Sequence, residues 1–178
     1  MKKTLVLTCA VMMTAGLAAA QDSPFNLGLP EDLTGSTVTW VSGTYDPAGG
    51  MASTICFLVS NTSPDTEWIT SAAVLFPATW VVACNSQDAT DSGGNTVNFD
   101  CDVLDNLVTY ADNDAGYGEI WDGETWGFCV DVTPPVGSWP PPQTVNWEVN
   151  GDGWGGEPHL ILGSENIVPV ELVSFSVE

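Results

Sequence analysis

Hydrophobic and polar residues alternate with a period of two along much of this chain. The alternation is cleanest in Thr125–Val132 and in Gln143–Val149. Because successive side chains of a β-strand point to opposite faces, this period predicts strands with one face in a core and the other toward water. The inward positions predicted in this way are Trp126, Phe128, Val130 and Val132 in the first run and Val145, Trp147 and Val149 in the second.

Further strand-length segments lie on both sides of these two runs. Ser53–Ser60 is a nearly continuous apolar run, which predicts a central strand with both faces covered. Clusters of Gly, Pro, Asn and Asp separate the segments, and this punctuation predicts an all-β fold built as a single antiparallel β-sandwich. The other predicted strands are Thr37–Val41, Trp68–Phe76, Thr79–Cys84, Thr96–Leu104, Asn106–Tyr110, His159–Leu162 and Ile167–Val177.

The N-terminal segment has a different character from the rest of the chain. Lys2 and Lys3 precede an apolar stretch, and three small residues end with Ala20. This is the pattern of a secretory signal peptide that is cleaved after Ala20. We therefore expect a signal peptide at 1–20, a flexible lead-in at 21–35, and a β-sandwich domain at 36–178 that ends in an apolar strand.

Removal of residues 1–20 would leave a chain without Lys or Arg. The two basic residues of the sequence both lie in that segment, whereas all 23 Asp and Glu residues lie outside it, so the mature formal charge is −23 with His neutral. Nucleic acids and anionic membranes are excluded as partners, because both are bound through basic side chains. Each carboxylate has to be hydrated, hydrogen-bonded or neutralised by a metal ion.

Four cysteines remain after the signal segment: Cys56, Cys84, Cys101 and Cys129. An even number of cysteines in an exported chain predicts two disulfides, for which three pairings are possible. Cys84 and Cys101 bracket a polar, glycine-containing loop, so we favour Cys84–Cys101 together with Cys56–Cys129, and the other pairings stay open. Disulfides form in oxidising compartments, so the protein is expected to be secreted and to lie outside the cell or on its surface.

Glycine-flanked aromatic residues occur in two acidic segments. Tyr117 and Trp154 each stand between glycines, and Trp121 and Trp126 lie close to them in the sequence. Aromatic rings displayed on such loops can stack on sugar rings, so these four residues are candidates for carbohydrate binding. The alternative is that the rings cover bare glycine backbone in hairpin turns.

The same segments carry carboxylates that could ligate a cation. Asp112, Asp114, Glu119 and Asp152 are the candidate ligands, and Ca²⁺ is the candidate ion because it prefers oxygen donors in loops. Neither segment has the twelve-residue spacing of an EF-hand. His159 is the only histidine, and the mature chain has no Lys or Arg to act as a phosphate clamp. We predict no catalytic residue and no enzymatic activity.

Cys56, Trp68 and Cys129 follow one another in the order and spacing of the Cys…Trp…Cys core of immunoglobulin-like domains. On these residues the segment from Thr37 to Val149 resembles an immunoglobulin-like β-sandwich. Gly127 departs from the pattern, which has a tyrosine two residues before the second cysteine. The resemblance implies an immunoglobulin-like fold, and such sandwiches are mostly binding or structural modules.

The C-terminal segment contains Pro169-Val-Glu-Leu172 followed by Ser174-Phe175. It resembles the Pro-Val-Glu-Leu-type strand found near the C-termini of many secreted bacterial surface proteins, which implies a bacterial cell-surface setting. The strand either closes its own sandwich or inserts into a neighbouring subunit, since an added strand completes an open sheet edge. Its apolar residues are Val168, Val170, Leu172, Phe175 and Val177.

Two functions follow as expectations. The leading one is a non-catalytic extracellular structural or cell-surface protein that assembles with itself, or with other surface proteins, by exchange of the terminal strand. The alternative is a carbohydrate-binding module that presents its glycine-flanked aromatic residues to a polysaccharide.

Overall fold

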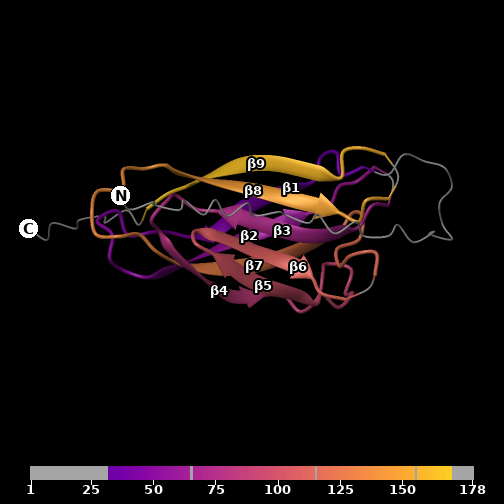
Figure 1. Cartoon of the computed structure of the whole chain (residues 1–178), viewed down its shortest axis with the longest axis horizontal. Coiled ribbons are helices and arrows are strands. Elements are labelled where there is room, and N and C mark those ends of the chain that lie inside the picture. Colours follow the sequence, from indigo (N-terminus) through magenta and orange to yellow (C-terminus); the bar gives the residue numbers. More distant parts are fainter. Residues whose placement is uncertain (1–31, 65, 115, 155, 170–178) are drawn as a thin grey trace, which may run out of the picture.

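Nine β-strands form the described part of the chain, which comprises residues 32–64, 66–114, 116–154 and 156–169 of a computed structural model (Figure 1). The strands lie roughly along the long axis of an elongated molecule, with loops at both ends. In chain order they are β1 (Thr37–Gly43), β2 (Ser53–Ser60), β3 (Ile69–Leu75), β4 (Val81–Gln87), β5 (Phe99–Leu104), β6 (Leu107–Asp112), β7 (Thr125–Thr133), β8 (Gln143–Gly151) and β9 (Leu160–Ile167).

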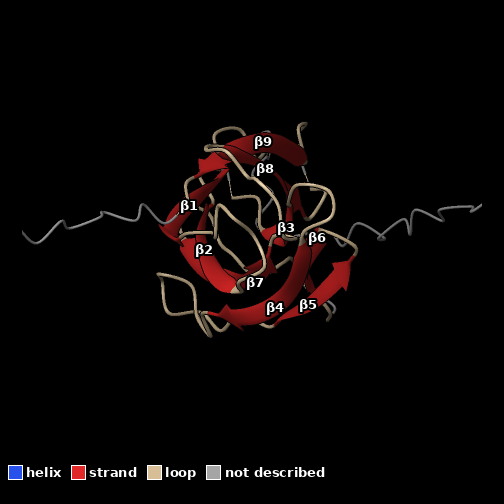
Figure 2. Ribbon diagram, turned by 90° about the vertical axis from the view of Figure 1, so that its left-hand side faces the viewer, coloured by secondary structure: helices blue, strands red, loops and turns tan. Residues whose placement is uncertain are grey.

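The strands are divided between two antiparallel sheets that face each other across one core. One sheet has four strands in the order β1-β2-β7-β4, and the other has five in the order β5-β6-β3-β8-β9. Figure 2 looks along the strands and shows the two sheets curving around the space between them. The predicted fold, an all-β antiparallel sandwich, is confirmed. No helix in the described part of the chain is long and apolar enough to cross a membrane.

The core is filled by the inward positions that the alternation predicted. Trp126 and Phe128 of β7 are buried, and they pack with Tyr110 of β6 from the opposite sheet. The prediction for Ser53–Ser60 was wrong in one respect. Phe57 of β2 is fully buried, but its neighbour Leu58 is half-buried and Thr54 is exposed. The second sheet covers only one face of β2, so the strand alternates despite its apolar composition.

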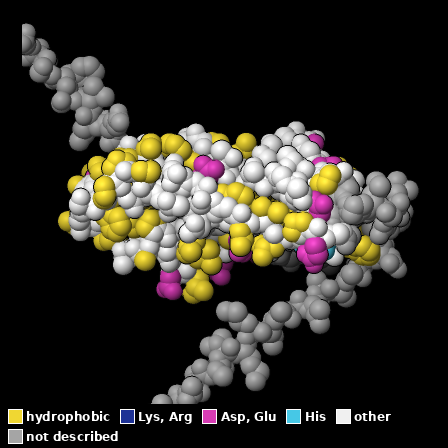
Figure 3. Space-filling view, turned by 90° about the horizontal axis from the view of Figure 1, so that it is seen from above, with side chains coloured by type: hydrophobic (Ala, Val, Ile, Leu, Met, Phe, Trp, Pro, Cys, Tyr) yellow, Lys and Arg dark blue, Asp and Glu magenta, His cyan; other side chains and the backbone are white. Residues whose placement is uncertain are grey.

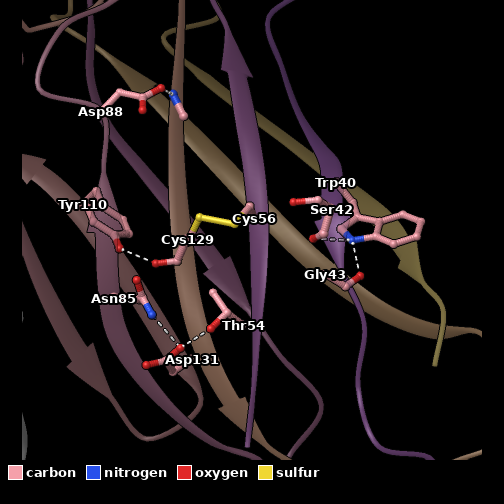
Figure 4. Close-up of a disulfide and its surroundings, with 11 residues drawn as sticks. Trp40, Ser42, Gly43, Thr54, Cys56, Asn85, Asp88, Tyr110, Cys129 and Asp131 are labelled. Atoms are coloured by element: carbon pink, nitrogen blue, oxygen red, sulfur yellow. Dashed lines mark hydrogen bonds between the residues drawn. A yellow bond between two sulfur atoms is a disulfide. The ribbon is translucent and has the colours of Figure 1, made fainter. Parts of the chain in front are cut away.

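The favoured disulfide pairing is confirmed, and the two bonds have different roles. Cys84 of β4 is bonded to Cys101 of β5, so this disulfide joins the outer strands of the two sheets. Cys56 of β2 and Cys129 of β7 are direct cross-strand neighbours within one sheet, with Cα atoms 4.0 Å apart (Figure 4). The Tyr110 hydroxyl reaches across the core and donates to the carbonyl of Cys129 at 3.0 Å.

This geometry corrects one detail of the immunoglobulin resemblance. In that family the disulfide crosses between the sheets and a tryptophan packs against it. Here Cys56–Cys129 stays within one sheet, and Trp68 precedes β3 and packs against Trp121 instead. The spacing of the three residues therefore matches the immunoglobulin pattern without the same core.

The sandwich closes on its other side where β1 and β9 approach each other. Tyr45, just after β1, forms a parallel bridge with Pro169. The strand predicted at His159–Leu162 is longer than expected and extends to Ile167 as β9. Of the strand predicted at Ile167–Val177, only the first three residues lie within the described part of the chain. Leu33 is fully buried and its N–H donates to the carbonyl of Pro158, so the expected boundary of the flexible lead-in at residue 35 falls too late.

Candidate functional site

Three loops meet at one end of the sandwich, the right-hand end in Figure 1: the β2–β3 loop (61–68), the β6–β7 loop (113–124) and the β8–β9 loop (152–159). Because β3 runs antiparallel to both β6 and β8, its start lies beside their ends. The Ile69 N–H donates to the Ile120 carbonyl at 3.0 Å, and the Asp152 N–H donates to the Trp68 carbonyl at 3.1 Å. We call this region the loop end.

Three of the four predicted aromatic residues lie at the loop end. Tyr117 and Trp121 belong to the β6–β7 loop and Trp154 belongs to the β8–β9 loop, and all three are half-buried. Trp68, from the β2–β3 loop, is half-buried too and packs edge-on against Trp121, with ring centroids 4.4 Å apart. The loop end therefore combines partly exposed aromatic rings from three loops.

Trp126, the fourth predicted aromatic residue, is not at the surface. Its side chain is fully buried, packs edge-on against Phe99, and donates from Nε1 to the carbonyl of Asp88 at 2.9 Å. The prediction was wrong because Trp126 occupies an inward position of β7. The alternation of polar and apolar residues, which predicts Trp126 in the core, was a stronger signal than its nearness in the sequence to the glycine-flanked aromatic residues.

The predicted calcium ligands are divided between two places. Asp112, Asp114 and Glu119 each bring a carboxylate oxygen within 4.8 Å of the others. Glu119 is buried and its Oε2 accepts the N–H of Asn98 at 3.0 Å. Burial, and then the charges of Asp112 and Asp114, raise the pKa of Glu119. Asp152 is on the β8–β9 loop and acts electrostatically on a different carboxyl, that of Glu67. Calcium binding by the first three residues stays a prediction.

A buried acid and the only histidine form a pair at the loop end that the sequence did not reveal. Glu67 is fully buried, and its Oε1 lies 2.9 Å from Nδ1 of His159. Its Oε2 is buried without a hydrogen-bond partner among the described residues. Burial raises the pKa of Glu67 to about 7, and the charge of Asp152 adds to this, whereas the hydrogen bond and charge of His159 and the backbone N–H of Gly153 act to lower it. The two residues are 92 positions apart, so spacing gave no signal.

Exposed leucines gather on the outer face of the five-stranded sheet. Leu104, Leu107 and Leu75 are cross-strand neighbours on β5, β6 and β3. Leu75, Leu107 and Leu162 line an open hollow of about 270 Å³ together with Ala73 of β3. Leu104 is 69% exposed, Leu162 68% and Leu75 39%. We call Leu75, Leu104, Leu107 and Leu162 the leucine face.

Carboxylates surround this apolar surface. Asp100 and Asp102 alternate outward along β5, and Glu148 of β8 lies between Ala73 and Leu162 in the register and lines the hollow. Since Lys2 and Lys3 are the only basic residues, no Lys or Arg can offset these charges within the described chain. Figure 3 views the molecule from the β8 and β9 side and shows hydrophobic side chains along its length, with acidic ones among them.

The leucine face has a signal in the sequence. Val74, Val108 and Ile161 occupy the inward alternation, so the adjacent Leu75, Leu107 and Leu162 are apolar residues at outward positions. An outward leucine on one strand is ordinary, but the cross-strand register that groups several of them on one surface appears only in the fold.

The last described strand, β9, ends where the predicted terminal strand begins, and it lies in the five-stranded sheet. β9 pairs with β8 along its whole length, and Ile167 is fully buried in the core. Val168 is 41% exposed. The remaining predicted assembly residues, Val170, Leu172, Phe175 and Val177, lie outside the described residues.

Comparison with known proteins gives structural similarities at low identity. The chain is similar to a cohesin module from a family 33 glycoside hydrolase of Clostridium perfringens, with 18% identity, a TM-score of 0.43, and coverage of 75% of this chain and 96% of the module. It is also similar to AvmM, described as catalysing macrocyclization in alchivemycin A biosynthesis, with 10% identity, a TM-score of 0.36, and coverage of 77% and 90%. No family model and no curated protein matches the sequence. Similarities this low say nothing about what the chain binds.

Proposed function

We propose that this protein is a non-catalytic extracellular module that binds another protein through the leucine face. The observation that carries the proposal is that two exposed leucines, Leu75 and Leu162, line one hollow together with the half-buried Leu107. Exposed Leu104 extends this apolar surface, since it is the cross-strand neighbour of Leu107. A contiguous exposed apolar surface with a polar rim is typical of a protein–protein interaction site. The two disulfides support a non-cytoplasmic location.

The charge around the leucine face indicates the chemistry of its partner. Asp100, Asp102 and Glu148 are acidic, and no basic side chain accompanies them. A second copy of the same face would bring like charges together, which disfavours self-association there. The partner that fits presents apolar side chains flanked by Lys or Arg.

A non-catalytic role is also supported by the surroundings of His159. Its Nδ1 contacts buried Glu67, and its Nε2 lies 4.0 Å from Oε1 of Glu157. Both ring nitrogens therefore face carboxylates rather than a hydroxyl or thiol nucleophile, which a Ser–His or Cys–His site would need.

The proposal can be tested with a short peptide in which leucine alternates with lysine. We expect it to bind the wild-type protein, with an affinity that falls as salt is added, and to bind the Leu162→Thr variant at least fivefold more weakly. Val81→Thr is the matched control, because Val81 lies on β4 of the other sheet and is also 68% exposed. Equal affinities of the two variants would remove the leucine face as the site.

Carbohydrate binding at the loop end is a second candidate, favoured by the grouping of Trp68, Tyr117, Trp121 and Trp154 from three loops. Titration of tryptophan fluorescence with a neutral β-glucan, a xylan and a mannan tests it. A response that is lost in Trp154→Ala but kept in Trp40→Ala supports this candidate. No response to any of the three sugars in the wild-type protein counts against it.

Self-assembly by exchange of the terminal strand stays a third, finer hypothesis. It requires the residues beyond Pro169 to pair with a neighbouring subunit. Deletion of 170–178 should then convert an oligomer to a monomer on a sizing column. A wild-type protein that already runs as a monomer at high concentration would end this hypothesis.

A further inference from the structure

The β8–β9 loop is folded across the β2–β3 loop by a small set of contacts centred on Glu67. The Gly151 N–H donates to the His159 carbonyl at 2.8 Å and closes the base of the loop. The Asp152 N–H donates to the Trp68 carbonyl at 3.1 Å, next to Glu67 in the chain. The Glu67–His159 contact joins the side chains of the two loops.

The buried position of Glu67 is energetically unfavourable in several respects, yet the structure maintains it. A Cβ on Gly151 would lie 1.8 Å from Oε1 of Glu67, so only glycine allows this close packing. Thr66, the preceding residue, has a φ of 86°, in the left-handed region that a β-branched residue rarely adopts. A buried carboxyl oxygen without a partner costs free energy as well. Strained backbone beside a buried polar group is more often associated with function than with stability.

The charged groups around Glu67 come mainly from one loop. His159, Asp152 and Glu157 all belong to the β8–β9 loop or its end. The β6–β7 loop approaches through the backbone of Ile120, which accepts from the Asn61 side chain, while the carboxylate of Glu119 accepts from Asn98. Among the described residues near Glu67, His159 is thus the one group that can carry a positive charge.

We propose that Glu67 and His159 form a pH-sensitive latch that holds the β8–β9 loop against the β2–β3 loop and opens when Glu67 loses its proton. With the proton present, the pair is bonded and no net negative charge is buried. Without it, a carboxylate with one unsatisfied oxygen remains buried beside Asp152, and hydration after opening relieves both costs.

The raised pKa of Glu67, to about 7, places this change near neutral pH. Opening would break the bond between the Asp152 N–H and the Trp68 carbonyl. Trp68 belongs to the β2–β3 loop and Trp154 to the β8–β9 loop, so opening of the latch changes the position of these two side chains relative to each other.

Hydrogen exchange of the Asp152 amide tests the latch directly, because its bond to the Trp68 carbonyl crosses between the two loops, whereas the Gly151 amide bonds within the β8–β9 loop and is the internal control. After correction for the intrinsic rate, we expect protection of the Asp152 amide in the wild type to fall by about tenfold per pH unit above pH 7, since one unit corresponds to a tenfold change in the proton equilibrium. Glu67→Gln keeps the shape and cannot ionise, so its protection should stay constant from pH 6 to pH 8.5. Identical profiles for the wild type and Glu67→Gln would overturn the proposal.

A second measurement needs no change at Glu67. The ¹³C signal of its carboxyl group, followed by NMR, should titrate with a midpoint near pH 7 in the wild type. In Asp152→Asn the midpoint should move to lower pH, because the Asp152 charge contributes to the raised pKa. Glu157→Gln is the control, since Glu157 is exposed and faces His159 rather than Glu67. A wild-type midpoint near the ordinary glutamate value would contradict the latch.

Discussion

The indole of Trp147 lies directly over the backbone of Gly163, its cross-strand neighbour on β9. A Cβ on Gly163 would lie 2.1 Å from Cζ2 of Trp147, so the ring occupies the space that any other residue would need. Trp147 is also one of the residues that line the hollow of the leucine face. The contact therefore fixes the edge strand that carries Leu162 to the sheet that carries Leu75.

Gly163→Ala should destabilise the protein through this contact. Overpacking of a filled position costs about 2 kcal/mol, so the urea midpoint should fall clearly. Ser164→Ala is the matched control, because Ser164 is the next residue of β9 and is exposed. The prediction fails if both variants unfold at the same urea concentration.

Removal of either disulfide should weaken the fold, and the loss should grow slowly, with the logarithm of the length of chain that the disulfide closes. Cys84 and Cys101 are separated by 17 residues, and their replacement by Ser should lower the free energy of unfolding by about 3 kcal/mol. Replacement of Cys56 and Cys129, separated by 73 residues, should cost about 4 kcal/mol. Urea unfolding measures both. A larger loss for the Cys84–Cys101 pair would mean that linkage of the two sheets matters more than chain entropy.

Stability should fall as the pH rises through neutrality. The pKa of Glu67 is raised from 4.5 to about 7, so the folded state holds this proton more tightly than the unfolded state. The resulting stabilisation is fully present below pH 4.5 and is lost as the pH passes 7, a loss of about 2 kcal/mol between pH 5.5 and pH 8. Urea unfolding at the two pH values should show the loss in the wild type and a much smaller one in Glu67→Gln. An equal loss of stability in the wild type and in Glu67→Gln would mean that other titratable groups cause the pH dependence.

The calcium hypothesis makes a prediction that separates the four candidate ligands. A cation bound only by the folded state raises the melting temperature, so CaCl₂ should raise it relative to EDTA. Asp112→Asn should abolish the rise, whereas Asp152→Asn should keep it, because Asp152 is not part of the three-carboxylate group. An unchanged melting temperature in the wild type would contradict calcium binding.

Much of the fold could be predicted because its signals are local. The alternation of Trp126, Phe128 and Val130 specifies which face of β7 is buried, whichever strands cover it. The polar loop between Cys84 and Cys101 was likewise a local reason to pair them. The covering of Ser53–Ser60 was predicted wrongly, since composition does not show how many layers a sandwich places on a strand.

The candidate sites were harder to predict because they depend on register and on long-range contacts. Leu75 and Leu162 are far apart in the sequence and meet only through the order β3-β8-β9. Glu67 and His159 likewise meet only because the start of β3 lies beside the end of β8. Tyr117, Trp121 and Trp154 were found from their loop chemistry, which is local, although their grouping with Trp68 was not.

The most direct test of the proposed function is an NMR titration of the ¹⁵N-labelled protein with the leucine–lysine peptide. The account predicts that the largest amide shift changes fall on the strands beneath the leucine face, at Leu75, Leu107, Asn146 and Leu162. Changes concentrated at the loop end, around Trp121 and Trp154, or on the other sheet, around Val81, would contradict it.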